Sequence, residues 1–486
     1  MLIDGALVDA ADGAALDSVN PATGEVWATF PAAGSVDVDR AVRAAHRAMT
    51  DGPWVRLTPS QRGKLIHRLA DLVAERADAM AEVETIDTGK LLRETRGLIK
   101  YVAEYYRYFA GLADKIEGAT LPIDKPDMLA MTLREPIGVV AAIIPWNSQL
   151  FLSAIKLGPA LAAGNALVIK ASEQGPAALL EFAKLIEPVG LPPGVVNIIT
   201  GLGDPCGKAL TSHPLVARVA FTGGPETARH VVRNAADNFA HVTLELGGKS
   251  PVVAFADADL ENTANAVIAG IFAASGQSCV AGSRLIVEEK LHDPLLSRIV
   301  ERARSIKIGD PLDAATEMGP LCTRAQLDRI EDTVARTIAA GGKLIYGGER
   351  PAHLNRGWYY APTIIDCPSG RLPSAEQELF GPVLSVLRFK DEEEAVRLAN
   401  DTNYGLAAGV FTADGARALR VTKRLRSGTV WINTYRAVSP IVPFGGYGQS
   451  GYGRESGRES VLEYTRTKSV WFNLSAQAMA DPFVMR

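Results

Sequence analysis

The pattern of apolar and polar residues changes near residue 138 of this chain. Before that point, residues 58–85 and 95–115 show helical spacing, and Thr58 followed by Pro59 is a typical helix start. Beyond it, short apolar runs alternate with helical stretches, which predicts a parallel α/β sheet whose ligands bind at the carboxyl ends of the strands. The expected strands begin with GVVAAIIPWN at residue 138 and continue at 166–170, 195–200 and 218–222, and helices are expected at 150–163 and 176–188.

The second half of the chain repeats this alternation with a different set of apolar segments. Residues 261–275 carry a mostly apolar stripe that predicts a helix. Strands are expected at 241–246, 252–255, 284–287 and 428–433. Two further segments, 119–136 and 464–474, are expected to be extended and have no evident place in either sheet.

The composition narrows the class of protein. A chain of 486 residues is too long for one ordinary core, so two or three domains are expected. With 47% hydrophobic residues, 22% charged residues and a net charge of −4, it resembles a soluble globular protein, and the absence of a basic block argues against nucleic-acid or membrane binding. No apolar run is long enough to span a bilayer, and no secretory signal is evident. Four scattered cysteines argue against metal sites and disulfides and favour the cytoplasm.

Three residues carry candidate chemistry. Cys279, in GQSCVAGSR, follows the expected apolar helix and is flanked by small residues, although most free cysteines simply pack in the interior. Asn147 follows the first apolar strand, where it either closes a turn or presents an amide donor. Glu245 lies in an apolar strand before Gly247 and Gly248, and is either a paired structural residue or a base with a raised pKa.

These residue types suit one reaction class. A thiolate attacks an aldehyde, an amide side chain and a backbone N–H stabilise the oxyanion, hydride passes to an oxidised cofactor, and a carboxylate activates the water that releases the acid. A further carboxylate, Glu378 in EQELFGPV, is on its own consistent with a surface residue before a turn.

Seven segments, taken in order, identify a family. They are PWN (145–147), IKASE (169–173), FTGGPETA (221–228), LELGGKS (244–250), GQSCVAGSR (276–284), ELFGPV (378–383) and PFGGYGQSGYGRE (443–455). Over nearly the whole chain they resemble the NAD(P)-dependent aldehyde dehydrogenase superfamily, of the hydrolytic, non-acylating kind. The resemblance implies oxidation of a small-molecule aldehyde to the carboxylic acid with NAD(P) and water.

The resemblance also implies roles for individual residues. Cys279 is the nucleophile that forms a thiohemiacetal and then a thioester, Glu245 activates the deacylating water, and Asn147 forms the oxyanion hole with the Cys279 N–H. Lys156 is expected to assist proton transfer, unless it is only a charge on a helix surface. Two alternatives stay open: a CoA-acylating aldehyde dehydrogenase, which does not need Glu245, and a non-catalytic structural or binding protein on the same fold. No metal site is expected, because no zinc-ligand spacing is present.

The cofactor is expected to bind at the strand ends, although the usual GxGxxG fingerprint is absent. GGPETA at 223–228 opens a helix and offers free N–H groups to a pyrophosphate, with Gly224 and Ala228 where many family members have serine and glycine. By resemblance Lys170 and Glu173 hold the adenosine ribose. NAD is preferred, because Glu173 repels a 2′-phosphate, and NADP stays possible, because Lys170 attracts one. The expected cofactor residues are Ile143, Pro145, Trp146, Lys170, Ser172, Glu173, Gly203, Gly207, Gly223, Gly224, Leu246, Glu378 (nicotinamide ribose) and Phe380 (beside the ring).

The substrate wall is expected to be mixed in character. By resemblance it is formed by Ser148, Leu152, Ile155, Ser278, Val280, Tyr435, Arg436 and Phe444. Ser148 and the neighbouring Gln149 replace bulkier or cyclic residues that are common after PWN, which indicates a roomier and more polar entrance. Arg436 either attracts an aldehyde that carries a carboxylate or is a solvated loop residue.

The expected fold is α/β, with a Rossmann-like parallel-sheet cofactor domain, a second α/β catalytic domain and a small β oligomerisation arm. The NAD-binding domain is discontinuous and covers 1–117 and 138–246, the catalytic domain covers 247–450, and the arm covers 118–137 and 465–486. Because VWFNL at 470–474 is suited to edge pairing with a neighbouring sheet, a homodimer or homotetramer is expected.

Overall fold

The first of two large sheets has eight strands in the order β19-β11-β10-β7-β8-β9-β1-β2. The computed structural model describes residues 1–479 and 481–484. The five central strands run parallel, as expected from their continuous apolar runs, and β8 is buried along its whole length. They are β7 (Val139–Ile143), β8 (Ala166–Lys170), β9 (Val196–Ile199), β10 (Val216–Thr222) and β11 (His241–Glu245), and the edges are β1 (Leu2–Ile3), β2 (Ala6–Leu7) and β19 (Gly451–Tyr452).

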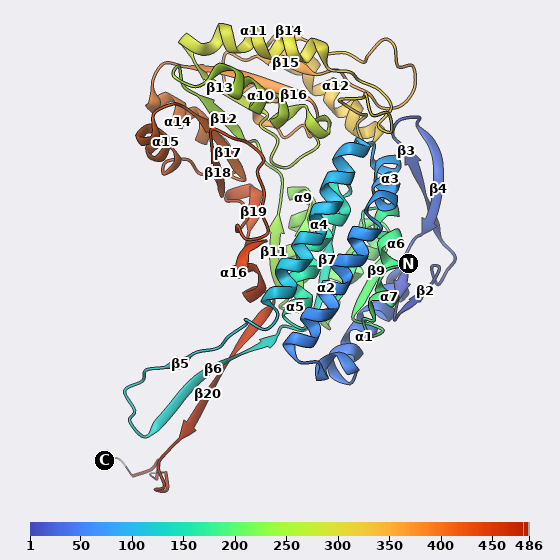
Figure 1. Ribbon diagram of the computed structural model, residues 1–486, viewed down its shortest axis with the longest axis vertical. Coiled ribbons are helices and arrows are strands. Elements are labelled where there is room, and N and C mark those ends of the chain that lie inside the picture. The colour runs from blue at the N-terminus through green and yellow to red at the C-terminus, as the bar shows by residue number, and fades with distance from the viewer. Residues whose placement is uncertain (480, 485–486) are drawn as a thin grey trace.

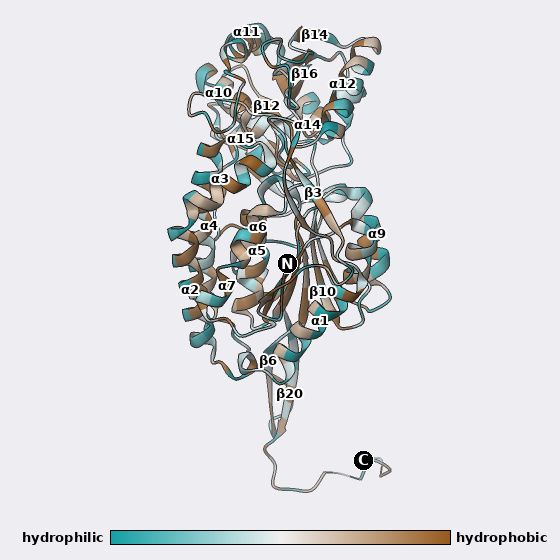
Figure 2. Ribbon diagram, turned by 90° about the vertical axis from the view of Figure 1, so that its right-hand side faces the viewer, coloured by the Kyte–Doolittle hydropathy of each residue, from teal (hydrophilic) through white to brown (hydrophobic). Residues whose placement is uncertain are grey.

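Helices cover both faces of this sheet (Figure 2). On one face lie α2 (Pro59–Glu75), α4 (Leu92–Leu112), α5 (Gln149–Ala162) and α6 (Ala177–Ala183), and on the other lie α1 (Ser35–Thr50) and α9 (Pro225–Ala235). The expected start of α2 is confirmed, because the Thr58 side chain accepts a hydrogen bond from the Gln61 N–H and Pro59 is the first helical residue. The short helix α8 (Lys208–Thr211) joins β9 to β10.

Three expected helices have different bounds in the structure. Residues 58–85 form α2 and α3 (Ala77–Thr88), which are separated at Arg76 so that α3 can pack against α4 and α6. Residues 176–188 form two helices, α6 and α7 (Ile186–Val189). At the junction between them, backbone N–H groups donate hydrogen bonds to carbonyls three residues earlier in the chain. The helix expected at 261–275 ends at Ile271, because the residues that follow adopt left-handed backbone conformations.

The second sheet has seven strands in the order β14-β15-β16-β13-β12-β17-β18, and all neighbours except β14 and β15 are parallel. Its strands are β12 (Pro251–Ala254), β13 (Arg284–Glu288), β14 (Lys343–Tyr346), β15 (Thr363–Asp366), β16 (Val383–Phe389), β17 (Ala407–Phe411) and β18 (Thr429–Ile432). Its helices include α10 (Leu260–Ile271), α11 (Glu289–Ser305), α12 (Arg324–Ala339), α14 (Glu392–Asn400) and α15 (Gly415–Thr422). The expected α/β fold with two parallel sheets is therefore confirmed.

A three-stranded sheet projects away from both larger sheets (Figure 1). In it β20 (Thr465–Asn473) runs antiparallel to β6 (Met128–Pro136) along its full length, and β5 (Thr120–Leu121) pairs with the other edge of β6. Trp471 and Phe472 of β20 are exposed. The two extended segments of the sequence thus pair with each other. Among the described residues, no helix combines the length and the apolar character that a membrane span requires.

Candidate active site

The carboxyl ends of adjacent strands bring the expected polar residues to one edge of the first sheet. Ile143 at the end of β7 is paired with Lys170 at the end of β8, and Thr222 at the end of β10 is paired with Glu245 at the end of β11. Asn147 follows β7 in the short helical turn Trp146–Ser148. The alternation of strands and helices in the sequence therefore predicted correctly that these residues lie at the carboxyl ends of parallel strands.

Cys279 follows a strained turn that lies between the two sheets. Ala274 and Ser275 have φ angles of 52° and 54°, in the left-handed region that non-glycine residues rarely adopt. The turn is held from outside, because the Ala274 N–H donates to Glu94 at 3.0 Å and the Ser275 hydroxyl donates to the Gly319 carbonyl at 2.8 Å. These contacts end the preceding helix and leave the Cys279 side chain partly exposed.

Gln277 connects the turn to Asn147. The Asn147 amide donates to the Gln277 carbonyl at 3.2 Å, and the Gln277 side chain accepts from the Cys322 N–H at 2.8 Å. Gln277 is fully buried, so the amide of Asn147 has a fixed position two residues from the thiol. The sequence analysis assigned no role to Gln277. The available signal was that Gln277 is a polar residue in a run of small residues.

Glu245 is buried without a partner. It is 4% exposed, and neither carboxylate oxygen has a hydrogen bond to any residue that the structure describes. Burial, and then the negative charge of Glu455, raise the pKa of Glu245 well above its usual range, while Lys156 opposes the shift. An unpartnered buried carboxylate is costly, and such groups are concentrated at functional sites.

Lys156 is 0% exposed and forms a buried ion pair with Glu455. The reading of Lys156 as a helix-surface charge is therefore wrong. Glu455 lies 299 residues further along the chain, at the end of the segment 443–455, and its residue type alone indicates no role. The structure brings the charges of Lys156 and Glu455 close enough to act on Glu245.

The surroundings of Cys279 favour the protonated thiol over the thiolate. Burial raises the pKa of Cys279 to about 12, and the carboxylates of Glu378 and Glu245 add to the effect. A thiolate is the reactive form, so a base must accept the proton when Cys279 reacts at neutral pH.

Glu378 lies beside the thiol segment instead of on the surface. One carboxylate oxygen accepts a hydrogen bond from the Gly248 N–H at 3.0 Å, and burial raises its pKa to about 7. A Cβ at Gly247 would lie 1.8 Å from the other oxygen, so a larger residue there would displace the Glu378 carboxylate. The rings of Trp146 and Phe380 meet edge to face with their centroids 5.5 Å apart, which joins two expected cofactor residues.

The other strand ends fit the sugar and phosphate groups of a dinucleotide. The Lys170 ammonium donates to the Ala171 carbonyl at 3.1 Å and pairs with Glu173 at 3.4 Å. The Thr222 hydroxyl is buried without a partner, and a Cβ at Gly224, the N-cap of α9, would meet nothing within 4 Å. An unpartnered hydroxyl, open space and a helix N-terminus are suited to hydrogen bonding an anionic ligand.

The remaining expected cofactor residues have simpler surroundings. Ser172 accepts a hydrogen bond from the Gln174 N–H within its turn, and the Leu246 N–H donates to the Ser450 carbonyl. Gly203 has open space where a Cβ would stand, and a Cβ at Gly207 would lie 3.7 Å from the Lys170 side chain.

The expected substrate residues divide into two groups. Val280, Tyr435 and Phe444 pack with Cys279 in one apolar cluster, and the Tyr435 hydroxyl donates to the Val280 carbonyl at 3.0 Å. Ser148 and Ser278 are half-buried. Ile155 is buried in the core cluster of the first sheet, and the half-buried Leu152 packs against that cluster. Arg436 is half-buried and donates to the Ala269 carbonyl at 2.9 Å, so it is anchored on α10 and is not a freely solvated loop residue.

Comparisons with known proteins agree with this architecture. Residues 7–470 match the model of the Aldehyde dehydrogenase family. The chain is 60% identical over 477 residues, 98% of its length and 97% of the relative's, to (Z)-2-((N-methylformamido)methylene)-5-hydroxybutyrolactone dehydrogenase of Acinetobacter baylyi. It is 41% identical over 481 residues, 99% of its length and 98% of the relative's, to betaine aldehyde dehydrogenase of Bacillus subtilis. An aldehyde dehydrogenase from Bacillus cereus, solved as an NAD+ complex, superposes with a TM-score of 0.96 at 42% identity, covering 98% of this chain and 96% of that one.

Proposed function

The chain belongs to the aldehyde dehydrogenase family, and we propose that this NAD(P)-dependent enzyme oxidises its aldehyde to the carboxylic acid through a thioester on Cys279. The observation that carries the proposal is Glu245, a buried carboxylate with no hydrogen-bond partner whose charge acts on the thiol. A buried carboxylate of this kind can accept a proton from a reacting group without breaking a hydrogen bond that stabilises the fold.

The first step is attack of the Cys279 sulfur on the aldehyde carbonyl carbon. The S–H bond breaks, and because the thiol pKa is about 12, Glu245 or a water next to it takes the proton. Charge develops on the former carbonyl oxygen, where the Asn147 amide and the Cys279 N–H donate hydrogen bonds. NAD, when bound, supplies the acceptor for the hydride of the former aldehyde carbon.

The second step is hydrolysis of the thioester. Glu245 removes a proton from water, the water oxygen attacks the acyl carbon, and the carbon–sulfur bond breaks to release the acid. The Lys156–Glu455 pair lies next to Glu245 and is suited to moving the accepted proton away from the site. This assignment gives Lys156 the proton-transfer role expected of it.

We propose NAD as the preferred cofactor. Glu173 is already paired with Lys170, so the lysine charge is partly engaged and the carboxylate repels a 2′-phosphate. Glu378, Phe380 and Trp146 would hold the nicotinamide end, and the start of α9 would hold the phosphates. A comparison of kcat/KM for NAD and NADP tests the preference, and a higher value with NADP would contradict it.

We propose that the substrate carries a carboxylate as well as an aldehyde. The Acinetobacter baylyi relative is a dehydrogenase for a 5-hydroxybutyrolactone. A hydroxylactone of this type is the closed form of an aldehyde acid, and ring opening gives a free aldehyde and a carboxylate. Arg436 offers a cation whose charge acts on Cys279. Arg436→Gln should therefore raise KM for an acidic semialdehyde more than for a neutral aldehyde, and equal effects would remove this role.

We also propose a function for each of three parts of the chain. The cofactor domain comprises 1–117 and 138–246, the catalytic domain 247–450, and the oligomerisation arm 118–137 and 465–486, of which residues 480, 485 and 486 lie outside the described residues. The edge strand β20 leaves one side unpaired and favours a homodimer or homotetramer. Size-exclusion chromatography with light scattering tests this, and a monomer would contradict it. The cytoplasmic location stays a prediction.

The direct test of the proposed function is a panel of aliphatic, aromatic and semialdehyde substrates with NAD, followed by NADH formation, with Cys279→Ala as the control. We expect turnover without CoA and none in the variant. Activity that requires CoA would support the acylating alternative, and no activity with any aldehyde would support the non-catalytic one.

A further inference from the structure

Lys90 is a buried cation next to the reacting thiol that has no place in the mechanism above. It lies in the connection between α3 and α4 and is 8% exposed. Its ammonium donates a hydrogen bond to the Ser148 hydroxyl at 2.5 Å. Ser148 follows Asn147 directly, so the ammonium is held one residue from the oxyanion donor.

The Lys90 ammonium is not in a direct ion pair. No carboxylate of residues 1–479 or 481–484 lies within 4.0 Å of it. Burial lowers the pKa of Lys90, and the more distant carboxylates of Glu84 and Glu94 only partly oppose the shift. Glu84 is itself buried without a hydrogen-bond partner, and burial raises its pKa to about 7, so its charge at neutral pH is incomplete. A buried cation with so little direct compensation is costly unless a ligand supplies the missing anion.

A second cation lies on the same side of the thiol. The charge of Arg436 lowers the pKa values of both Lys90 and Cys279, and the charge of the Cys279 thiolate raises that of Lys90. Arg436 has a left-handed φ of 64° and is anchored on α10 through the Ala269 carbonyl. Lys90 bonds the half-buried Ser148, and Arg436 acts on Lys90 and on the half-buried Cys279 from a segment far away in the sequence.

We propose that Lys90, held by Ser148, binds the carboxylate of an anionic aldehyde together with Arg436 and so determines which aldehydes reach Cys279. This inference rests on the proposed function and adds the specificity-determining residue to it. An ammonium with one hydrogen bond to a hydroxyl still has N–H groups for a carboxylate, and a charge-assisted bond of this kind is stronger than a neutral one. The hydroxyl at position 148 is part of the arrangement, because a side chain without one would remove this hydrogen bond to the ammonium.

The test compares two aldehydes of equal chain length, succinic semialdehyde and butanal, in wild type and Lys90→Met with saturating NAD. For the wild type we expect kcat/KM at least about tenfold higher for the acidic aldehyde. Lys90→Met should lower kcat/KM for succinic semialdehyde by about 10- to 100-fold, mainly through KM, and change that for butanal by less than about threefold. Lys90→Arg should keep most of the preference. Lys100→Met, which removes an exposed α4 lysine, is the matched control.

Two outcomes would overturn the inference. If Lys90→Met lowers kcat/KM equally for both aldehydes, Lys90 only balances the charges of Glu84 and Glu94. If neither substrate is affected, Lys90 is outside the site. Should Lys90→Met fail to fold, Ser148→Ala replaces it, with the same selective loss for succinic semialdehyde expected at about three- to tenfold.

A binding measurement separates this inference from the proposed function. Succinate should protect Cys279 from alkylation by iodoacetamide at lower concentration than butyramide does, and Lys90→Met should remove the difference. Protection without any aldehyde turnover would contradict the proposed function and support the anion site. Turnover of both aldehydes with no difference in protection would contradict the anion site alone.

Discussion

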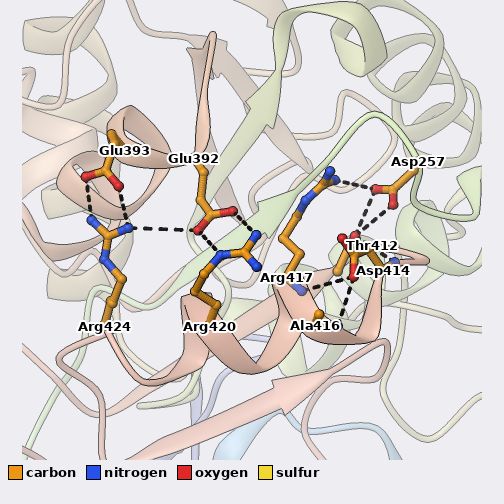
Figure 3. A network of polar contacts seen from close by, with 9 residues as sticks. All are labelled: Asp257, Glu392, Glu393, Thr412, Asp414, Ala416, Arg417, Arg420 and Arg424. Atoms are coloured by element: carbon orange, nitrogen blue, oxygen red, sulfur yellow. Dashed lines mark hydrogen bonds and ion pairs between the residues drawn. The ribbon is translucent and has the colours of Figure 1, made fainter.

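Two clusters of charged residues in this molecule differ in how their polar atoms are satisfied. On α14 and α15 of the second sheet, each carboxylate has arginine partners: Glu392 bonds Arg420 at 2.8 and 2.7 Å, and Glu393 bonds Arg424 at 2.6 and 2.5 Å (Figure 3). The Asp257 carboxylate likewise accepts hydrogen bonds from the Thr412 hydroxyl and the Arg417 guanidinium. At the strand ends of the first sheet, both oxygens of Glu245 have no partner.

This difference separates a structural cluster from a functional one. The arginine pairs in Figure 3 are largely exposed and complete, so they add little free energy each and need no ligand. The Glu245 region is buried and incomplete, which costs stability and leaves groups able to exchange protons. The fold tolerates the cost at the place where the aldehyde is expected to react.

The largest expected effect is that of removing the thiol. Cys279→Ala should abolish NADH formation, with a loss of at least ~10⁴-fold in kcat, because the proposed thioester forms on the Cys279 sulfur. The measurement is steady-state NADH production, with cofactor affinity from fluorescence titration as the control. Residual activity within about tenfold of wild type would place the nucleophile elsewhere.

Replacing the unpartnered carboxylate should have the next largest effect. Glu245→Gln should lower kcat by roughly 10²- to 10⁴-fold, because water loses its base. Glu245 must be ionised to act and its pKa is raised, so wild-type kcat should fall as pH falls through a value well above that of an ordinary glutamate. The variant should lose that acid limb. A pH profile that keeps the same limb in the variant would assign it to another group.

The oxyanion donor comes third. Asn147→Ala should reduce kcat by about 10²- to 10³-fold, since one positioned donor to the developing charge is removed. The KM for NAD should stay near that of the wild type. The measurement is kcat/KM for each substrate in the panel, and a loss confined to KM would mean that the amide only positions the substrate.

The smallest expected effect lies in the complete cluster. Arg420→Gln should change the melting temperature by no more than ~2 °C, because the exposed pair contributes little. Its kcat/KM should equal that of the wild type. The melting temperature is measured by differential scanning fluorimetry. A decrease of several degrees would show that this ion-pair network stabilises the fold more than its exposure suggests.

Some of this arrangement was predictable from the chain and some was not. Asn147 and Glu245 were predictable because each follows or ends an apolar run, and the carboxyl ends of parallel strands share one edge. The left-handed turn at Ala274 was hidden by a helical pattern, because its conformation depends on a bond to Glu94 from a distant helix. The Lys156–Glu455 pair joins residues 299 positions apart and leaves no local signal.

Contacts with the substrate wall were the least predictable. Leu152 and Ile155 have the apolar character expected of such a wall, and both also contact the core of the first sheet, Ile155 as a buried and Leu152 as a half-buried residue. Lys90 lies in a connection between two helices, where a lysine is ordinarily exposed. Its side chain points inward to the Ser148 hydroxyl, a contact that the sequence does not indicate. Residue type alone does not distinguish a side chain that lines a site from one that packs behind it.

The most direct test of the central claim is a single-turnover experiment with Glu245→Gln, wild-type Cys279 and a reactive aldehyde with NAD. The account predicts a burst of NADH that approaches one equivalent per site, slower than in the wild type because Glu245 also serves the thiol proton, followed by almost no turnover. It also predicts a mass increase on the Cys279 peptide equal to the acyl group. Continued turnover at the wild-type rate, or a burst without acylation of Cys279, would contradict the assignment of Glu245 as the base that releases the acid.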